Sequence, residues 1–375
     1  MTDEAKTLSG KRFAEIDILR GFAMLAVVSI HVSNIPLANL PAGRRYFLVY
    51  MFNSFINFAV PMFILISAMV AAHSEANRPL HVKTYYKKKI LRLGLPYLTW
   101  SLFYILFNIL VHRVGWTDLL SWKNWIEWIL QGRAYEHMYF LAVILQFHIL
   151  YPLLIKLALL VKDKPFWAFF IAIGGQHCVY WLNKLWIYER FTYFYSSVFG
   201  YFGIIFLGLY LGLNYKKVNR WLRKNVKWLS IFCLISVIAF LYYRYLLHIK
   251  VSFHSYPYSF IRLFFVASLP LCLLAPAQSL RVKEGWIGRG LLWVGRYTLG
   301  IYLAHPVLNF FLRRWVKTDN LLYLFLISAA AVFVFTIICG YMTKFLEKFK
   351  LTSWLVGANI EKATVIAASE PQSPG

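Results

Sequence analysis

Long apolar runs recur along this chain and are separated by short polar connectors. A helix needs about 20 largely apolar residues to cross the hydrocarbon core of a bilayer, and about ten runs approach that length. They lie at 17–38, 47–72, 90–111, 138–161, 166–182, 194–213, 228–248, 260–278, 291–311 and 321–343. Because the connectors leave no room for a soluble domain, the runs predict an all-α polytopic membrane protein with about ten transmembrane helices.

The composition agrees with lipid as the main solvent. Of 375 residues, 60% are hydrophobic and only 15% are charged, whereas soluble domains carry about 25% charged residues. The net charge of +25 would suggest nucleic-acid binding in a soluble chain. Here many Lys and Arg residues lie in the connectors, so membrane topology explains them. We therefore expect a multi-pass protein of the cell (cytoplasmic) membrane. The lipid bilayer is its expected partner, and we expect no nucleic-acid partner.

The distribution of basic residues predicts an orientation. Odd-numbered connectors and the tails hold about twice as many Lys and Arg residues as the opposite connectors, and such residues favour the cytoplasmic side. We therefore expect both termini in the cytoplasm. The predicted divisions are a cytoplasmic tail at 1–12, a transmembrane domain at 13–345 and a cytoplasmic C-terminal tail at 346–375, whose polar end after Lys362 is predicted to be disordered.

One stretch outside the apolar runs has a pattern of its own. Residues 112–137 contain DLLSWKNWIEWILQG, whose Trp and Leu spacing predicts a short helix lying at the membrane interface. A loop of interfacial aromatic residues is the alternative.

The first apolar run contains two groups that are costly inside a membrane, Arg20 and His31, within ILRGFAMLAVVSIHVSN. Eleven residues of α-helix rotate through about 1100°, so the two side chains share one face, about 16 Å apart along the axis. That face offers an anion-binding group at the cytoplasmic mouth and a proton-transfer group at depth. The alternative is that Arg20 reaches lipid phosphate while His31 makes an interhelical hydrogen bond.

The third run begins YYKKKILRLGLPYLTW and adds two more cations. Lys89 and Arg92 are three residues apart, so an α-helix would stack them on one face at its cytoplasmic end. With Arg20 they would form a positive cluster suited to phosphate groups. Pro96 interrupts the helical hydrogen bonds and can open space for a ligand.

Histidines also lie in the fourth and ninth runs. EHMYFLAVILQFHILYPLL begins with Glu136 and His137 at its predicted outer end and holds His148 deeper, which we interpret as a packing histidine. VGRYTLGIYLAHPVLNF holds Arg296 and His305. Nine residues rotate through about 900°, so these two side chains face opposite ways on one helix.

Taken in order, these stretches resemble the integral-membrane acyltransferase 3 family, whose bacterial members O-acylate cell-surface glycans. IDILRGFAMLAVVSIHVSN resembles the first helix of the family, with its Arg-x10-His spacing, and KKKILRLGLPYL resembles the basic third-helix motif. EHMYFLAVILQFHILYPLL and VGRYTLGIYLAHPV resemble the histidine–aromatic–Phe–Leu and Tyr-Leu-x-His-Pro segments. Two positions depart from the pattern: Lys89 stands where arginine is usual, and Tyr139 where tryptophan is common.

The resemblance implies an acyl-CoA donor, most often acetyl-CoA, that enters from the cytoplasm, and an extracytoplasmic or lipid-linked glycan as the acceptor. Arg20, Lys89 and Arg92 would bind the CoA phosphates, and His31 would act as the general base, with a transient acyl-histidine as the other variant. Candidate substrate-binding residues are His137, Tyr139 and His305. No metal is expected, because the four cysteines have no metal-ligand spacing. The polysaccharide synthesis machinery is a further candidate partner.

A function of another class also fits a chain with many membrane helices and intramembrane polar groups. Such a protein can be a transporter or flippase for a glycan or its lipid-linked precursor. Acidic residues that could couple ions to transport are nearly absent from the apolar runs, and the basic groups gather at one mouth. These two features favour the enzyme.

Overall fold

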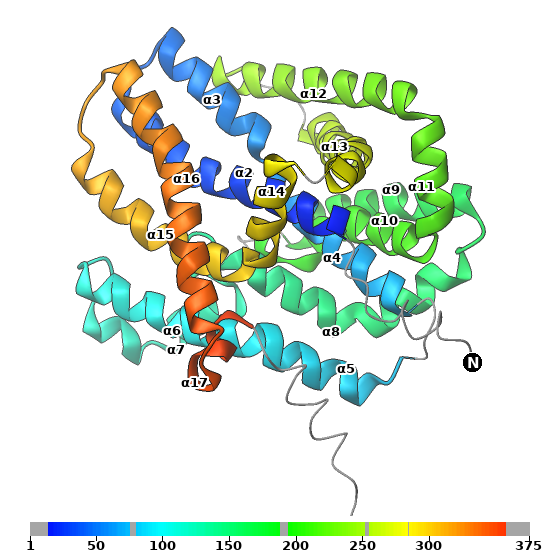
Figure 1. The fold of residues 1–375 in the computed structure, drawn as a ribbon, viewed down its shortest axis with the longest axis horizontal. Helices are drawn as coiled ribbons and strands as arrows, with labels where there is room; N and C mark the ends of the chain where they lie inside the picture. Colours follow the sequence, from blue (N-terminus) through cyan, green and yellow to red (C-terminus); the bar gives the residue numbers. More distant parts are fainter. Residues whose placement is uncertain (1–13, 76–79, 188–193, 252–254, 284, 358–375) are drawn as a thin grey trace, which may run out of the picture. The chain divides into compact units, whose positions relative to one another are not determined.

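The computed structural model describes residues 14–75, 80–187, 194–251, 255–283 and 285–357. Every regular element among them is helical, which confirms the predicted all-α class (Figure 1). The chain divides into two compact units. Unit 1 comprises Met1–Phe63, Asn219–Thr298 and Val316–Thr336, and unit 2 comprises Ile64–Val218, Leu299–Trp315 and Ile337–Gly375.

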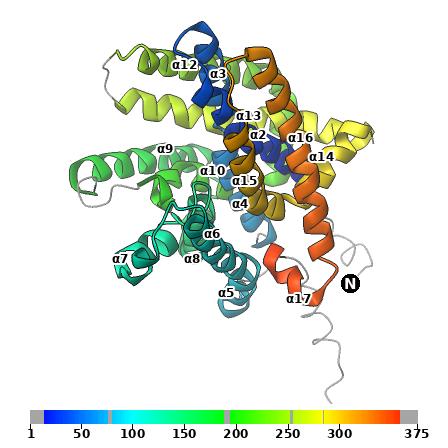
Figure 2. The same cartoon turned by 90° about the vertical axis from the view of Figure 1, so that its left-hand side faces the viewer.

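Unit 1 is built around α2, the first described helix. It packs against α3, α13 and α14, and α12 packs against α13 and α3; Figure 2 shows α12 and α13 side by side. Aromatic rings fill part of the interior, where Phe265 stacks on Phe240 with ring centroids 4.5 Å apart. The helices of this unit are α2 (Ala14–Asn39), α3 (Arg44–Ile56), α12 (Val226–His248), α13 (Ser255–Lys283) and α14 (Trp286–Arg296).

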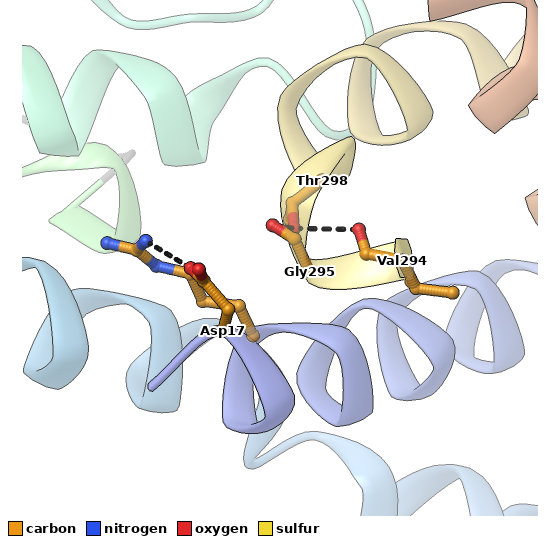
Figure 3. A network of polar contacts seen from close by, with 5 residues as sticks. Asp17, Val294, Gly295 and Thr298 are labelled. Atoms are coloured by element: carbon orange, nitrogen blue, oxygen red, sulfur yellow. Dashed lines mark hydrogen bonds and ion pairs between the residues drawn. The ribbon is translucent and has the colours of Figure 1, made fainter. Parts of the chain in front are cut away.

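Two glycines bring the backbones of α2 and α14 into direct contact. A Cβ atom on Gly21 would overlap the carbonyl oxygen of Leu291, and one on Gly295 would overlap the carbonyl oxygen of Asp17. Small residues permit this close approach, which is a common way to join helices inside a membrane. Figure 3 shows Gly295 beside Asp17, while the hydroxyl of Thr298 donates to the carbonyl of Gly295 at 2.7 Å.

Polar side chains join α2 to α3 as well. The Asn53 amide donates to Ser33 Oγ at 2.8 Å and to the carbonyl of Ile30 at 3.3 Å. From α12, Arg244 Nε donates to Ser54 Oγ at 3.0 Å. Hydrogen bonds between membrane helices fix their rotation relative to one another. The helix that carries Arg20 and His31 is therefore held on several sides within unit 1.

Unit 2 contains most of the remaining helices, several of them short. They are α5 (Val82–Lys89), η1 (Ile90–Gly94), α6 (Leu95–Leu110), η2 (Trp116–Leu120), α7 (Trp122–Trp125), η3 (Ile126–Leu130), α8 (Tyr139–Leu160), α9 (Pro165–Leu182), η4 (Asn183–Ile187), η5 (Phe194–Ser196), η6 (Val198–Tyr201), α10 (Phe202–Leu213), α17 (Lys350–Ser353) and η7 (Trp354–Val356). Four further helices contain a boundary between the units: α4 (Ala59–Glu75), α11 (Tyr215–Lys224), α15 (Thr298–Trp315) and α16 (Leu321–Leu346). The predicted short helix within 112–137 is present, as η2, α7 and η3.

The sequence predicted about ten membrane spans, which is more than the described helices provide. The described residues contain seven helical stretches that are long and apolar enough to cross a membrane, some of them made of two or three consecutive helices. The number is eight if the bent pair Val198–Leu213 and Tyr215–Lys224 is one span. The run 291–311 instead forms two helices, α14 and α15, which meet at Tyr297. The run 166–182 forms α9, whose apolar character is interrupted by Gln176 and His177.

Other predictions about topology are not decided by the helices. The cytoplasmic location of both termini stays a prediction. The tail predicted at 1–12 and the disordered end predicted after Lys362 lie outside the described residues.

The α2–α14 contact gives a test on two glycines of the same helix. Gly295→Ala should destabilise the protein by about 1–3 kcal/mol, because the new methyl group has no room beside Asp17. Gly290→Ala is the matched control: its Cβ would meet nothing within 4 Å, so the better helix propensity of alanine should leave stability unchanged or raise it by up to about 1 kcal/mol. Thermal unfolding of both variants in detergent compares them, and equal melting temperatures would contradict the packing described here.

Candidate active site

The Arg20–His31 pair lies on one uninterrupted helix. Because α2 runs from Ala14 to Asn39 without a break, the rotation of about 1100° between the two residues applies and they share a face. Met24 and Val27 lie between them on that face and are 0% and 2% exposed. Arg20 and His31 themselves are half-buried. The stripe is therefore covered along its middle and accessible at its two ends.

An ion pair orients the guanidinium of Arg20. Its Nη1 donates to Asp17 Oδ1 at 3.0 Å, and the Asp17 side chain is the more buried partner. The carboxylate of Asp17, one helical turn before Arg20, compensates a positive charge that would be costly by itself inside a membrane. A guanidinium has five N–H donors, so it can hold Asp17 and bind a phosphate at once.

The second basic pair, Lys89 and Arg92, lies in unit 2 at a change of helix type. Lys89 is the last residue of α5, and Arg92 lies in the π-helical turn η1. Pro96 explains the π-turn, because it lacks the N–H that would bond the carbonyl of Arg92 in an α-helix. The α-helical spacing behind the predicted stacking does not continue through this π-turn, and the position of the two side chains on one face stays a prediction.

The aromatic ring of Tyr85 contacts Lys89. Its ammonium lies 5.5 Å from the centroid of the Tyr85 ring, a cation–π distance. The Tyr85 hydroxyl is hydrogen-bonded to His148 Nδ1 at 2.6 Å, and its ring stacks on Tyr151 at 4.9 Å. His148 is 5% exposed, in agreement with a packing histidine. Tyr85 thus links a buried histidine to one of the predicted phosphate-binding cations.

Two buried histidines from distant segments meet in unit 2. His137 and His305 are 1% and 0% exposed, and their ring centroids are 5.9 Å apart. His305 Nδ1 lies 2.9 Å from the carbonyl of Ile301. Because that carbonyl can only accept, Nδ1 carries the proton and Nε2 is the basic nitrogen of the neutral ring.

Tyrosines that the sequence analysis did not single out frame this histidine pair. Tyr302 donates to the backbone carbonyl of His137, and Tyr104 donates to the carbonyl of Leu303 at 2.6 Å. Each ring centroid is 5.0 Å from that of His137. Tyrosine within an otherwise apolar run was the only sequence signal for them. Tyr139, in contrast, packs edge-on against Tyr195.

An exposed arginine was also missed by the sequence analysis. The Arg113 guanidinium lies 4.9 Å from the Phe310 ring centroid and 5.8 Å from that of Tyr135, two residues before His137. Burial raises the pKa of Tyr135, and the positive charge of Arg113 opposes that rise. Arg113 is therefore a further candidate for binding an anionic group.

The seven predicted site residues thus form three local groups. Arg20 and His31 share a stripe of α2 in unit 1, while Lys89 with Arg92, and His137 with His305, lie in unit 2, where Tyr139 follows His137 by two residues. Among the described residues, no group of three or more His, Cys, Asp or Glu side chains could hold a metal ion. The positively charged side chains of these groups can bind anions, and their imidazole rings can transfer protons.

The fold and these groups define a polytopic membrane protein with side chains that can bind anions and transfer protons. A family model described as an acyltransferase domain matches residues 13–344, so the chain belongs to the acyltransferase 3 family. It is 23% identical to the probable poly-beta-1,6-N-acetyl-D-glucosamine export protein of Staphylococcus aureus, over 94% of this chain and 98% of that protein. It is 24% identical to the protein of the same description from Staphylococcus epidermidis, over 92% and 95% of the two chains. No solved structure matches it.

The hydroxyl of Tyr302 provides a test of the histidine cluster. Tyr302→Phe should lower stability by about 1–2 kcal/mol, because the buried carbonyl of His137 loses a donor, and activity should fall if this cluster binds substrate. Tyr242→Phe, at a side chain that is 56% exposed, is the control and should change neither quantity. Thermal unfolding and activity are measured on the same preparations. An unchanged melting temperature in Tyr302→Phe would show that the hydrogen bond contributes nothing to stability.

Proposed function

We propose that this protein is a membrane O-acyltransferase. It moves an acyl group, with acetyl as the first candidate, from cytoplasmic acyl-CoA to a hydroxyl of an extracytoplasmic or lipid-linked glycan. Membership of the acyltransferase 3 family supports the reaction class. The observation that carries the mechanism is the stripe of α2 on which Arg20 and His31 share a face, with buried residues between them.

Donor binding is assigned to the cations. Arg20, oriented by Asp17, is assigned to phosphate groups of CoA, which guanidinium groups bind through charge-assisted hydrogen bonds. The resemblance assigns the same kind of contact to Lys89 and Arg92, which lie in unit 2. The distance of about 16 Å from Arg20 to His31 along the helix is comparable with the reach of an extended pantetheine arm. A donor held by its phosphates at Arg20 is therefore long enough to reach the level of His31.

His31 acts as the general base in this proposal. It accepts the proton of the acceptor hydroxyl as the oxygen attacks the thioester carbonyl. The new C–O bond forms, the C–S bond breaks, and the proton passes to the departing thiolate to give free CoA. The imidazole returns to its neutral form, so one group serves as base and then as acid. Transfer is written here as direct, without an acyl-enzyme.

The acceptor side is assigned to unit 2. His137, Tyr139 and His305 contact the acceptor, and the buried tyrosines 104 and 302 hold the histidine pair in place. The relatives are named for a poly-N-acetylglucosamine, which supports an amino-sugar polymer or its precursor as the acceptor. Such a glycan offers hydroxyl groups for esterification. The polysaccharide synthesis machinery is then the natural source of the acceptor.

The names of the relatives also favour a second function, export of the glycan. Purified protein in proteoliposomes separates the two. Transfer of label from acetyl-CoA to a glycan supports the enzyme, whereas glycan movement that needs no acyl-CoA supports the exporter.

His31→Ala should abolish acyl transfer, with a loss of at least about 100-fold, because a positioned general base contributes about 100- to 10,000-fold. Ser29→Ala is the matched control on α2, since its hydroxyl is bonded to the carbonyl of Leu25 and it lies on another face. Labelled acetyl-CoA consumption and mass spectrometry of surface polymers measure the effect. Full activity in folded His31→Ala would falsify the general-base mechanism.

Arg92→Gln should raise the KM for acyl-CoA by about tenfold and leave kcat nearly unchanged, because a phosphate contact far from the thioester contributes equally to ground state and transition state. High salt should reduce the difference between variant and wild type. Arg289→Gln removes another exposed arginine and is the control. An unaltered KM in Arg92→Gln would remove Arg92 from the donor site.

A further inference from the structure

Part of the predicted C-terminal tail is folded onto unit 2. After α16 the chain continues as α17 and η7 and ends its described part at Gly357. Ser353 and Val356 are 4% and 5% exposed, so this segment is packed. η7 contacts α6 and the π-turn η1. We call residues 350–357 the C-terminal clasp.

The clasp is held at both of its ends by hydrogen bonds. Trp100 Nε1, on α6, donates to the carbonyl of Leu355 at 3.1 Å. The Thr352 hydroxyl donates to the carbonyl of Leu346 at 2.8 Å, which joins the clasp to the last turn of α16. A hydrogen bond from an indole N–H to a backbone carbonyl is directional. This bond therefore fixes the position of the clasp on α6.

Gly357 brings the clasp against the backbone of Arg92. Its φ of 68° and ψ of 20° are left-handed, a conformation that costs other residues free energy. A Cβ atom there would lie 2.6 Å from the carbonyl oxygen of Arg92 and 2.9 Å from Leu299 Cδ2. Both the backbone conformation and the close approach therefore require glycine.

The contacted carbonyl belongs to a turn in which the regular α-helical hydrogen bonding is interrupted. Pro96 has no N–H for the α-helical bond to Arg92, and the chain forms the π-turn Ile90–Gly94 there. The direction in which such a turn presents its side chains depends on the groups packed against it. In this protein the clasp packs against η1, directly at the residue assigned to the donor.

We propose that the clasp positions the π-turn so that Arg92 can bind the phosphates of acyl-CoA, with Gly357 and Trp100 as positioning residues. This inference rests on the donor-binding role assigned to Arg92 in the proposed function. Neither Gly357 nor Trp100 touches the donor. Their effect is on the orientation of the turn that carries Arg92, so they alter donor affinity and leave the chemical step unaltered.

Two substitutions at Gly357 separate its contact from its conformation. Asparagine adopts the left-handed conformation more readily than alanine, yet both side chains would place Cβ against the Arg92 carbonyl. If the contact matters, Gly357→Ala and Gly357→Asn should both raise the KM for acetyl-CoA, on the order of tenfold, with kcat changed less than about twofold. If only the conformation matters, Gly357→Asn should behave like the wild type, and this result overturns the positioning role of the contact.

Trp100→Phe is the second probe and keeps an aromatic ring while removing the N–H donor to Leu355. This variant should also raise the KM for acetyl-CoA. It tests the proposal independently if the Gly357 variants fail to fold. The matched control is Gly174→Ala on α9 of unit 2, where a Cβ atom would meet nothing within 4 Å. This variant should leave both kinetic constants unchanged.

Hydrogen exchange of the backbone amides in 90–95 gives a readout that does not depend on catalysis. Faster exchange in Gly357→Ala and Trp100→Phe, together with a raised KM, supports the proposal. If the wild type is active and the KM for acetyl-CoA is unchanged in Gly357→Ala, Gly357→Asn and Trp100→Phe, the clasp proposal is wrong and the proposed function is unaffected. A wild type that transfers no acyl group overturns the proposed function, and the donor-positioning role falls with it.

Discussion

The backbone contact between α2 and α14 is the constraint on which the candidate site in unit 1 depends. Gly21 and Gly295 remove the two Cβ atoms that would separate the helices. Asp17 then has two functions at one position, because its carbonyl faces Gly295 while its carboxylate holds Arg20. The same turn of α2 therefore sets both the packing of the helix and the direction of the guanidinium.

A proline has the comparable role in unit 2. Pro96 removes one donor from the backbone, and the turn before it becomes a π-turn that carries Arg92. Lys89, directly before that turn, is fixed through the Tyr85 ring and the bond from Tyr85 to His148. The two cations are thus supported differently, one by aromatic side chains and the other by backbone and the clasp. A point charge over an aromatic face needs no bidentate geometry, so a lysine is sufficient for the contact with the Tyr85 ring.

The sequence predicted features that belong to a single helix and missed features that depend on tertiary packing. The Arg20–His31 spacing needs only an unbroken helix, and the length and apolar character of α2 are local properties. The π-turn at Arg92 was foreseen only as a disturbance caused by Pro96, because its final form depends on what packs against it. The pairing of His137 with His305 joins residues 168 positions apart, which helical periodicity does not report. The division of 291–311 at Tyr297 was missed because its apolar pattern continues across the break.

The buried carboxylates of the described residues are confined to one end of α2. Among the described residues, the buried carboxylates are Glu15 and Asp17, both in the first turn of α2, and Asp17 is paired with Arg20. Transport driven by protons or cations ordinarily requires acidic groups near the middle of the membrane, where their protonation state can alternate. The buried imidazoles are those of His137, in the turn before α8, His148 on α8 and His305 on α15. An imidazole can take a proton from a hydroxyl and return it to a thiolate within one turnover, which is the requirement of acyl transfer.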